Sequence, residues 1–154
     1  MSKTKVLAGM SVIAGLAVAM AGVTIAQDAA ATIAKRKAMM KEVGAATKLS
    51  NEMIKGEKPY DAKAAAEGMT KIATGWAEFA KLYTKGTETG HETTAAPKIW
   101  ETFKDFDEKG QALAKAAETA AAEAAKGPEA FKAAFTAVGG TCKSCHEVYR
   151  VQKK

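Results

Sequence analysis

The sequence predicts an all-α fold, an antiparallel bundle of four helices. Three observations support this prediction. Apolar residues recur three and four positions apart along four segments, Pro and Gly separate those segments, and no alternating runs of β-branched or aromatic residues indicate strands. The 154 residues suit a single domain of ordinary size. A composition rich in Ala, Lys, Glu and Met, with only three prolines, is also typical of helical proteins.

Residues 1–26 are predicted to form a cleaved signal peptide. A short start with two lysines precedes an apolar stretch from about residue 6 to residue 20, and small residues follow. We place the cleavage after Ala26, because polar sequence begins at the next residue; Ala19-Met20-Ala21 is a second candidate. The alternative, an uncleaved membrane anchor, is disfavoured because the stretch is short and diluted by Gly and Ala. Residues 27–154 would then form the mature domain, exported to the periplasm.

The first helix is predicted over residues 27–55. Its inward side chains, spaced as on one helical face, are Ile33, Arg36, Met40, Val43, Thr47, Ser50 and Ile54. Gly56 to Pro59 breaks this helix, and Asp61 is positioned to cap a second one, which runs to about Tyr83. The second helix has the inward stripe expected in a bundle, namely Ala65, Met69, Ile72, Trp76, Phe79 and Tyr83.

The second half of the chain is predicted to hold one long loop and two further helices. Residues 84–96 lack apolar periodicity and form the loop, and Pro97 suits the first turn of the third helix. The inward residues of the third helix are Ile99, Phe103, Phe106, Gly110, Leu113, Ala117 and Ala120. Gly127-Pro128 separates it from the fourth helix, whose stripe is Phe131, Phe135, Val138, Cys142, Cys145 and Tyr149. Gly139-Gly140 interrupts that helix at up to ~2 kcal/mol relative to two alanines, so we expect another group to approach closely there.

One motif in the fourth helix carries recognisable chemistry. Cys142-Lys143-Ser144-Cys145-His146 has the Cys-x-x-Cys-His pattern of covalent c-type haem attachment. Residues three and four apart share one face of a helix, so the two thiols and the imidazole project to the same side. Each thiol can add to a haem vinyl group as a thioether, and His146 can then ligate the iron. The sequence therefore predicts one covalently bound haem c per chain.

Other uses of these residues fit less well. A thioredoxin-like redox pair requires a strand–helix context, which the pattern does not indicate. A disulfide between Cys142 and Cys145 would close a loop of only two residues and constrain very little. A zinc site would need a fourth ligand, and the only other histidine, His91, lies in the predicted loop. We expect His91 to be exposed.

The opposite face of the haem must be formed by other helices. Met40, Trp76, Phe79 and Phe103 are the inward candidates, and ordinary core packing is the alternative interpretation of each. Met40 matters most, because its thioether can be the sixth iron ligand or only a bulky lid. Periodicity does not separate these two roles.

Charged residues near the motif leave two interpretations open. Arg36 lies one turn before Met40, and Arg150 lies one turn after His146, so each arginine either pairs with a haem propionate or is solvated. Removing residues 1–26, which hold two lysines and no acids, lowers the formal net charge from +6 to +4. Two propionates would lower it by about two more. This small balance gives no support for nucleic-acid binding, while docking to an acidic redox partner stays open.

The predicted mature region resembles the cytochrome c′ family along its whole length. The features that carry the resemblance are Arg36 and Met40, the Lys55-Gly56-Glu57-Lys58-Pro59-Tyr60-Asp61 turn, Trp76-Ala77-Glu78-Phe79, the Gly86-Thr87-Glu88-Thr89-Gly90 loop, Pro97-Lys98-Ile99-Trp100, and the C-terminal haem motif followed by Arg150. The haem motif is the most specific of these features, because most small c-type cytochromes carry it near the N-terminus.

This resemblance implies a homodimer of four-helix bundles with five-coordinate, high-spin haem iron. His146 would ligate the iron on a solvent-reachable side beside Arg150, and apolar groups matching Met40, Trp76 and Phe79 would close the other side. Members of the family bind nitric oxide and carbon monoxide, discriminate against oxygen, and are implicated in nitric oxide tolerance or electron transfer. Low-spin cytochrome c-556 relatives share the bundle, and in them a methionine matching Met40 ligates the iron. The Trp76/Phe79 pair and the Gly-Thr-Glu loop favour the cytochrome c′ interpretation.

Two functional hypotheses follow. The first is a gas-binding protein with an open, apolar distal pocket, and the second is an electron carrier that exchanges electrons with small redox proteins. We do not expect an enzyme, because no inward Asp, Glu or distal His is apparent that could assist peroxide cleavage or proton transfer. No membrane association is expected once the signal peptide is removed.

Overall fold

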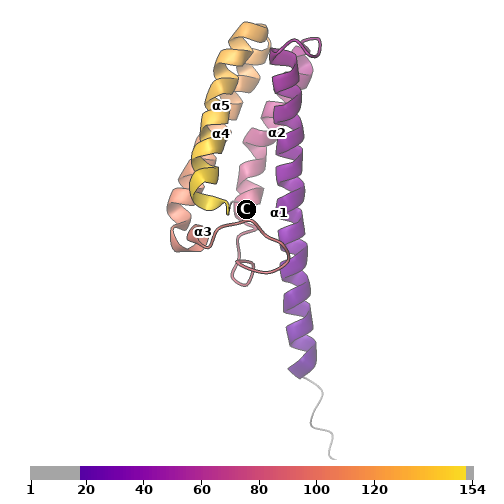
Figure 1. Cartoon of the computed structure of the whole chain (residues 1–154), viewed down its shortest axis with the longest axis vertical. Helices are drawn as coiled ribbons and strands as arrows, with labels where there is room; N and C mark the ends of the chain where they lie inside the picture. Colours follow the sequence, from indigo (N-terminus) through magenta and orange to yellow (C-terminus); the bar gives the residue numbers. More distant parts are fainter. Residues whose placement is uncertain (1–17, 152–154) are drawn as a thin grey trace, which may run out of the picture.

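The computed structural model describes residues 18–151 and consists of helices joined by turns and one long loop. α1 (Val18–Ile54) and α2 (Ala62–Ala80) form one pair, α4 (Phe103–Ala124) and α5 (Pro128–Tyr149) form another, and a short helix, α3 (Lys98–Glu101), precedes α4. α2 packs along α4 and α4 along α5, whereas α1 contacts mainly α2 and touches α5 only sparsely. Figure 1 shows the two pairs side by side, with the loop before α3 crossing the lower end of the bundle. The predicted four-helix bundle is confirmed.

The helix ends follow capping signals in the sequence. Asp61 has an extended backbone (φ −119°, ψ 104°), and its carboxylate accepts a 3.0 Å hydrogen bond from the backbone N–H three residues on, at the start of α2. Gly127 has φ +111°, which an L side chain rarely adopts, and it precedes Pro128 in the first turn of α5. The Tyr60 hydroxyl donates a 2.7 Å hydrogen bond to the carbonyl of Ala124, the last residue of α4. The α1–α2 turn and the end of α4 are therefore held together.

The predicted third helix is divided at Thr102. The backbone of Thr102 (φ −132°, ψ 49°) leaves helical geometry, and its hydroxyl lies 2.9 Å from the hydroxyl of Tyr149 on α5. Phe103 therefore occupies the first position of α4 and is 41% exposed, so the expectation that it faces inward was wrong. The physical reason is that Phe106, whose ring lies 5.3 Å from the Tyr149 ring, already fills the interior at this level.

Two further expectations about helix geometry need correction. α2 ends at Ala80, whereas the sequence pattern extends it to about Tyr83, and the chain continues in a turn. α5 runs through Gly139 and Gly140 without interruption. Both glycines are exposed, and a Cβ at either position would meet no atom within 4 Å among the described residues. The close approach expected at these glycines is therefore not found in this part of the chain.

The interior consists of two buried clusters. The first lies between the helices toward the α1–α2 and α4–α5 turns, and Phe131 and Val138 at its centre are fully buried. The second, which we call the aromatic cluster, lies toward the α3 end. Its buried members are Phe79, Ile99, Phe106 and Tyr149, and the partly buried residues packed against them include Met39, Met40, Trp76, Tyr83, Trp100 and Cys145. Neighbouring rings in the aromatic cluster lie 4.8–5.8 Å apart, in the range of favourable aromatic contacts.

Residues 84–96 form the predicted loop, which we call the strap because it joins α1 to α5. Two backbone hydrogen bonds, of 3.0 and 2.8 Å, pair residues 94–96 with residues 149–151 at the end of α5. At the other end of the strap, Nη2 of Arg36 on α1 donates a 2.8 Å hydrogen bond to the carbonyl of Thr87. The strap thus bridges two helices that make few contacts of their own.

The predicted signal peptide falls mostly outside the described residues. α1 extends upstream of Gln27 as far as Val18, and residues 1–17 are not described. None of the described helices has both the length and the apolar character needed to cross a membrane. The cleavage after Ala26 stays a prediction.

Candidate functional site

The Cys-x-x-Cys-His motif occupies the last two turns of α5. Cys142 and Cys145 are three residues apart on one helical face, are both partly buried, and are not joined in a disulfide. Cys145 packs against the aromatic cluster, while Cys142 packs against the first cluster. His146 follows on the exposed side of the helix. The motif therefore spans the boundary between the two clusters, with its sulfurs turned toward the interior and its imidazole accessible to solvent.

Burial sets the protonation of these groups. It raises the pKa of both Cys142 and Cys145, so the two groups are neutral thiols at neutral pH and lack the thiolate character of redox-active or zinc-binding cysteines. Desolvation lowers the pKa of His146, and the positive charge of Arg150 lowers that pKa further. A neutral imidazole is the form that can donate its lone pair to a metal. Within the described residues, no group of three or more His, Cys, Asp or Glu side chains could hold a metal ion.

Arg36 is a buried cation that lacks an anionic partner in the described part of the chain. The residue is 4% exposed, and its guanidinium lies over the rings of Tyr83 and Trp100, 4.5 and 5.7 Å from their centroids. Nη2 donates to the carbonyl of Thr87, but Nε and Nη1 are buried and have no hydrogen-bond partner among residues 18–151. A buried charge with unsatisfied donors costs several kcal/mol, on the order of 3–5 when its partner is missing. An anionic group that is not part of the polypeptide would remove this cost, and a haem propionate has the required charge.

The three predicted distal residues line one cavity. Met40 on α1 and Trp76 and Phe79 on α2 border a space of about 310 Å³, to which Leu113 on α4 also contributes. Phe79 is buried and belongs to the aromatic cluster, against which Met40, Trp76 and Cys145 also pack. Residues far apart in the sequence are therefore brought to one buried region, beside the helix that carries the haem motif.

Trp76 is held against α4 by two contacts. Its indole Nε1 donates a 2.8 Å hydrogen bond to Oδ1 of Asp107, whose Oδ2 accepts a 2.6 Å bond from Gln111. The ring also lies directly over Gly110, since a Cβ at that position would be only 1.9 Å from the Trp76 ring atoms. Glycine is therefore required at position 110 for the indole to take this place. Together, the hydrogen bond and the ring packing hold α2 closely against α4 at the level of Trp76.

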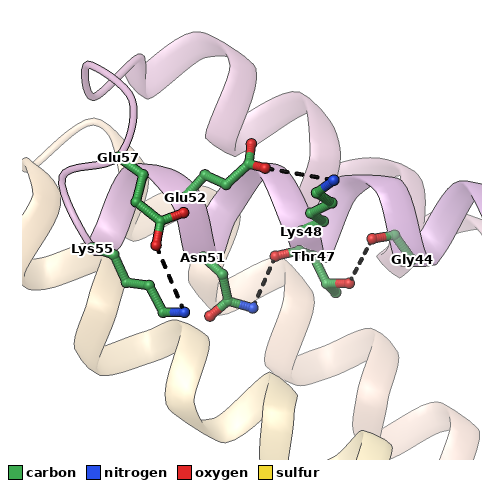
Figure 2. A pocket seen from close by; sticks show the side chains of 7 residues that line it. All are labelled: Gly44, Thr47, Lys48, Asn51, Glu52, Lys55 and Glu57. Atoms are coloured by element: carbon green, nitrogen blue, oxygen red, sulfur yellow. Dashed lines mark hydrogen bonds and ion pairs between the residues drawn. The ribbon is translucent and has the colours of Figure 1, made fainter.

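The remaining candidate residues lie outside this region. Arg150 is exposed and follows the last residue of α5, near enough to His146 for its charge to lower the pKa of that imidazole. His91 is exposed in the strap, where its backbone is left-handed (φ 48°). A second hollow, of about 500 Å³, lies on α1 near the α1–α2 turn. Figure 2 shows that its lining side chains bond mainly to each other and to the α1 backbone, as in the 3.7 Å Lys48–Glu52 ion pair. None of the predicted site residues lines this hollow.

Several residues of the site could not be assigned from the sequence. The backbone carbonyl of Thr87 accepts a hydrogen bond from Arg36, and the carboxylate of Asp107 accepts one from Trp76. Neither residue belongs to a periodic apolar pattern, so the sequence does not single it out. Tyr83 and Trp100 are aromatic residues whose inward position the pattern can suggest, but their stacking on Arg36 depends on the course of the strap. Gly110 carries the one usable signal, because an isolated glycine inside a helix often marks a close approach.

The fold and the site together define a class of protein. A four-helix bundle that carries two free thiols and a histidine near the end of its last helix has the features of a bundle-type c-type cytochrome. The buried guanidinium of Arg36, which has two unbonded nitrogens in the described part of the chain, agrees with this class.

Comparison with known proteins specifies the family. Residues 31–150 match the family described as Cytochrome C'. The chain is 39% identical over 144 residues to a cytochrome c' of Rhodopseudomonas palustris, covering 94% of this chain and 97% of the relative. It is also 36% identical over 124 residues to a cytochrome c-556 of Agrobacterium tumefaciens, covering 80% of this chain and all of the relative. The chain belongs to the cytochrome c′ family, which confirms the resemblance noted in the sequence.

Solved structures agree with this assignment. A cytochrome c' from Rhodopseudomonas palustris superposes with a TM-score of 0.76 at 37% identity, covering 80% of this chain and 98% of that one. A ferrous variant of cytochrome c prime from Alcaligenes xylosoxidans with bound NO superposes with a TM-score of 0.70 at 28% identity, covering 79% of this chain and 94% of that one. As a member of this family, the chain carries covalently bound haem c.

Proposed function

We propose that the chain is an exported c-type cytochrome that binds nitric oxide or carbon monoxide at a five-coordinate, high-spin haem. The observation that carries this proposal is the convergence of Met40, Trp76, Phe79 and Cys145 on one buried, apolar region with a cavity beside it. When bound, the haem supplies an iron atom with one open coordination position for a neutral diatomic molecule. The residues of this chain decide how the group is held and what can reach that position.

On the proximal side, Cys142 and Cys145 would form the two thioethers and His146 would ligate the iron. Their spacing on α5 places all three groups within one helical turn of each other. The lowered pKa of His146 keeps its imidazole neutral and therefore competent as a ligand. Arg36, held by Thr87 and the rings of Tyr83 and Trp100, would direct its two free nitrogens to a propionate. Arg150 would contribute positive charge beside the proximal imidazole.

On the distal side, Met40, Trp76 and Phe79 would exclude water and offer no strong hydrogen-bond donor. The only polar atom of these three side chains that donates a hydrogen bond, Trp76 Nε1, is already bonded to Asp107. An apolar surrounding without a donor favours neutral ligands such as nitric oxide or carbon monoxide and gives bound oxygen no stabilising hydrogen bond. The Alcaligenes xylosoxidans relative with bound NO supports the same chemistry here.

The alternative is a low-spin electron carrier in which Met40 is the sixth ligand. Two observations support this alternative. The Met40 side chain packs against the same cluster as Cys145, and the chain is 36% identical to a cytochrome c-556. Ligation by His146 and Met40 would raise the reduction potential and suit exchange of electrons with small redox proteins.

Absorption and electron paramagnetic resonance spectra of the purified ferric and ferrous holoprotein separate these two functions. We expect a high-spin spectrum in the wild type that Met40→Ala leaves high-spin, and a new spectrum on addition of nitric oxide. Met39→Ala is the matched control, because Met39 lines the same cavity one position away. A low-spin wild type that becomes high-spin in Met40→Ala but not in Met39→Ala would establish the alternative. A high-spin protein that binds no nitric oxide would contradict the gas-binding function.

Export and assembly are further parts of the proposal. Cleavage after Ala26 in the periplasm would leave a mature chain that starts at Gln27, and mass spectrometry of the intact protein measures that boundary. The family resemblance implies a homodimer, which light scattering of the holoprotein tests. A monomer at micromolar concentration would contradict the dimer without affecting the haem site.

A further inference from the structure

The last turn of α5 carries His146 and depends on one residue for its attachment to the bundle. α5 ends at Tyr149, which is buried, whereas residues 146–148 of the same turn are all exposed. The last four carbonyls of a helix have no partners within the helix, so a helix end frays unless tertiary contacts oppose the fraying. An iron ligand in this turn therefore requires such a contact.

The helix is also weak on the other side of the haem motif. Gly139-Gly140 lies just before Cys142, glycine has the lowest helix propensity after proline, and a Cβ at either glycine would meet no atom within 4 Å in the described part of the chain. Thioethers at Cys142 and Cys145 would attach the segment to the haem, but His146 is the first residue beyond them. The backbone of His146 therefore lies between a covalent attachment on one side and Tyr149 on the other.

Hydrogen bonds from both its side chain and its backbone hold Tyr149 in place. The hydroxyl donates a 2.6 Å hydrogen bond to Oδ2 of Asp105 on α4 and lies 2.9 Å from the hydroxyl of Thr102. The Tyr149 carbonyl accepts a 3.0 Å bond from the backbone N–H of Ala96 in the strap. The bond to Asp105 is the strongest of these, because its acceptor is charged. Tyr149 thus joins the end of α5 to α4 through its side chain and to the strap through its backbone.

The Tyr149 side chain acts on the helical face that carries the second sulfur. Cys145 and Tyr149 are four residues apart and share a face, and both belong to or pack against the aromatic cluster, where the Tyr149 ring lies 5.3 Å from the ring of Phe106. A contact that fixes this face also fixes the rotation of the last turn about the helix axis. That rotation sets the direction in which the exposed His146 side chain projects.

We propose that Tyr149, through its hydrogen bond to Asp105, is a positioning residue that holds His146 in place as a ligand of the haem iron. This inference rests on the proposed function, in which His146 ligates the iron, and specifies what keeps that ligand in position. Without the bond, the last turn of α5 opens more often, and the imidazole adopts a wider range of orientations.

Tyr149→Phe in the holoprotein tests this role, because it keeps the ring and removes only the hydroxyl. In resonance Raman spectra of the ferrous protein, we expect the iron–histidine stretching band to broaden and to shift to lower frequency, as a less constrained imidazole binds more weakly. Hydrogen exchange gives a readout that does not depend on the iron. The amides of Ala96 and Arg150 bond to the carbonyls of Tyr149 and His146, and their exchange should become at least about tenfold faster, as expected for a lost hydrogen bond to a charged acceptor.

Tyr60→Phe is the matched control. It also removes a tyrosine hydroxyl that donates a 2.7 Å hydrogen bond, but the acceptor is the carbonyl of Ala124 at the opposite end of the bundle. This variant should leave the iron–histidine band and the exchange of the two amides unchanged.

Substitutions of Asp105 test whether Tyr149 acts through this carboxylate. Asp105→Ala should reproduce the band of Tyr149→Phe, whereas Asp105→Asn keeps an acceptor oxygen and should lie closer to the wild type. Combining Asp105→Ala with Tyr149→Phe should add little to either change, because both remove the same bond. Fully additive shifts would contradict an action through Asp105.

An iron–histidine band in Tyr149→Phe with the position and width of the wild type would overturn the positioning role, even if the amides exchange faster. An equal shift in Tyr60→Phe would overturn it as well. A low-spin wild type would contradict the gas-binding function alone, and the same comparison would then decide the role of Tyr149 in a Met40→Ala background. A high-spin ferrous protein without an iron–histidine band would overturn both.

Discussion

Replacing Gly110 by alanine places a methyl group where the structure puts the indole of Trp76. The Cβ would lie 1.9 Å from two atoms of that ring, closer than any packed pair of carbon atoms can come. The far end of a flexible side chain could yield to such a contact, but this ring is rigid and is bonded to Asp107. The indole must therefore either stay and displace α4, or move and give up its hydrogen bond.

The expected loss of stability follows from these two outcomes. Overpacking a fitted site costs about 1–3 kcal/mol, and a lost hydrogen bond to a charged acceptor costs about 1.5–3 kcal/mol. Alanine returns about 1 kcal/mol through its better helix propensity. The net expectation is a destabilisation of up to about 2 kcal/mol, which for a chain of this size lowers Tm by up to roughly 8 °C.

Urea and thermal unfolding of the holoprotein, followed by circular dichroism at 222 nm, measure this change. Gly44→Ala is the control, because its Cβ would meet nothing within 4 Å. It should stabilise the protein by about 0.5–1 kcal/mol through helix propensity alone. Opposite signs for the two variants are expected. If Gly110→Ala proved as stable as Gly44→Ala, the contact between Trp76 and Gly110 would not exist as described.

Two further predictions concern a helix cap and an ionisable group. Asp61→Ala removes the carboxylate that caps α2 and should lower the free energy of unfolding by about 1 kcal/mol. Asp61→Asn keeps a side-chain oxygen that can accept the same hydrogen bond and should lose much less stability. Equal losses for the two variants in thermal unfolding would contradict the cap. Burial raises the pKa of Tyr83 far above its ordinary value near 10, so the folded protein keeps this phenol protonated while the unfolded chain releases its proton. Its contribution to stability is complete below about pH 10 and is lost progressively as the pH rises further, by up to about 1.4 kcal/mol per pH unit. Urea unfolding between pH 9 and 12 should show a shallower decline in Tyr83→Phe, and an unchanged slope would refute the assignment.

The helices were predictable wherever their boundaries depend on local signals. Asp61 and Gly127-Pro128 act on the backbone within a few residues of themselves, so their effect can be read from the sequence. No Pro or Gly in the sequence marks the break at Thr102. The Thr102 hydroxyl meets the hydroxyl of Tyr149, 47 residues away, and a tertiary contact of this kind leaves no local pattern. The exposure of Phe103 follows from the same break.

Prediction of the site had the same limit. Cys142 and Cys145 are assigned by their spacing, because residues three apart share one face of a helix. His146 was expected on that same face, but it lies on the exposed side of α5. Periodicity also placed Arg36 and Met40 inward, and the structure brings both to the haem-bearing end. Periodicity did not identify the partner of Arg36, because the carbonyl of Thr87 belongs to the strap, and the path of the strap depends on the assembled bundle. The role of Asp107 is likewise visible only once α2 and α4 are packed together.

The strap also determines how the molecule yields to mechanical force. α1 begins and α5 ends at the same end of the bundle, so tension on the two chain ends pulls these helices apart across the strap (Figure 1). The load there falls on the backbone pairing of residues 94–96 and on the bond from Arg36 to Thr87, which break one after another. Each bond contributes only about 0.5–1.5 kcal/mol. Under tension, the end that carries the haem should open first, while the opposite end, where Tyr60 is bonded to Ala124, separates last.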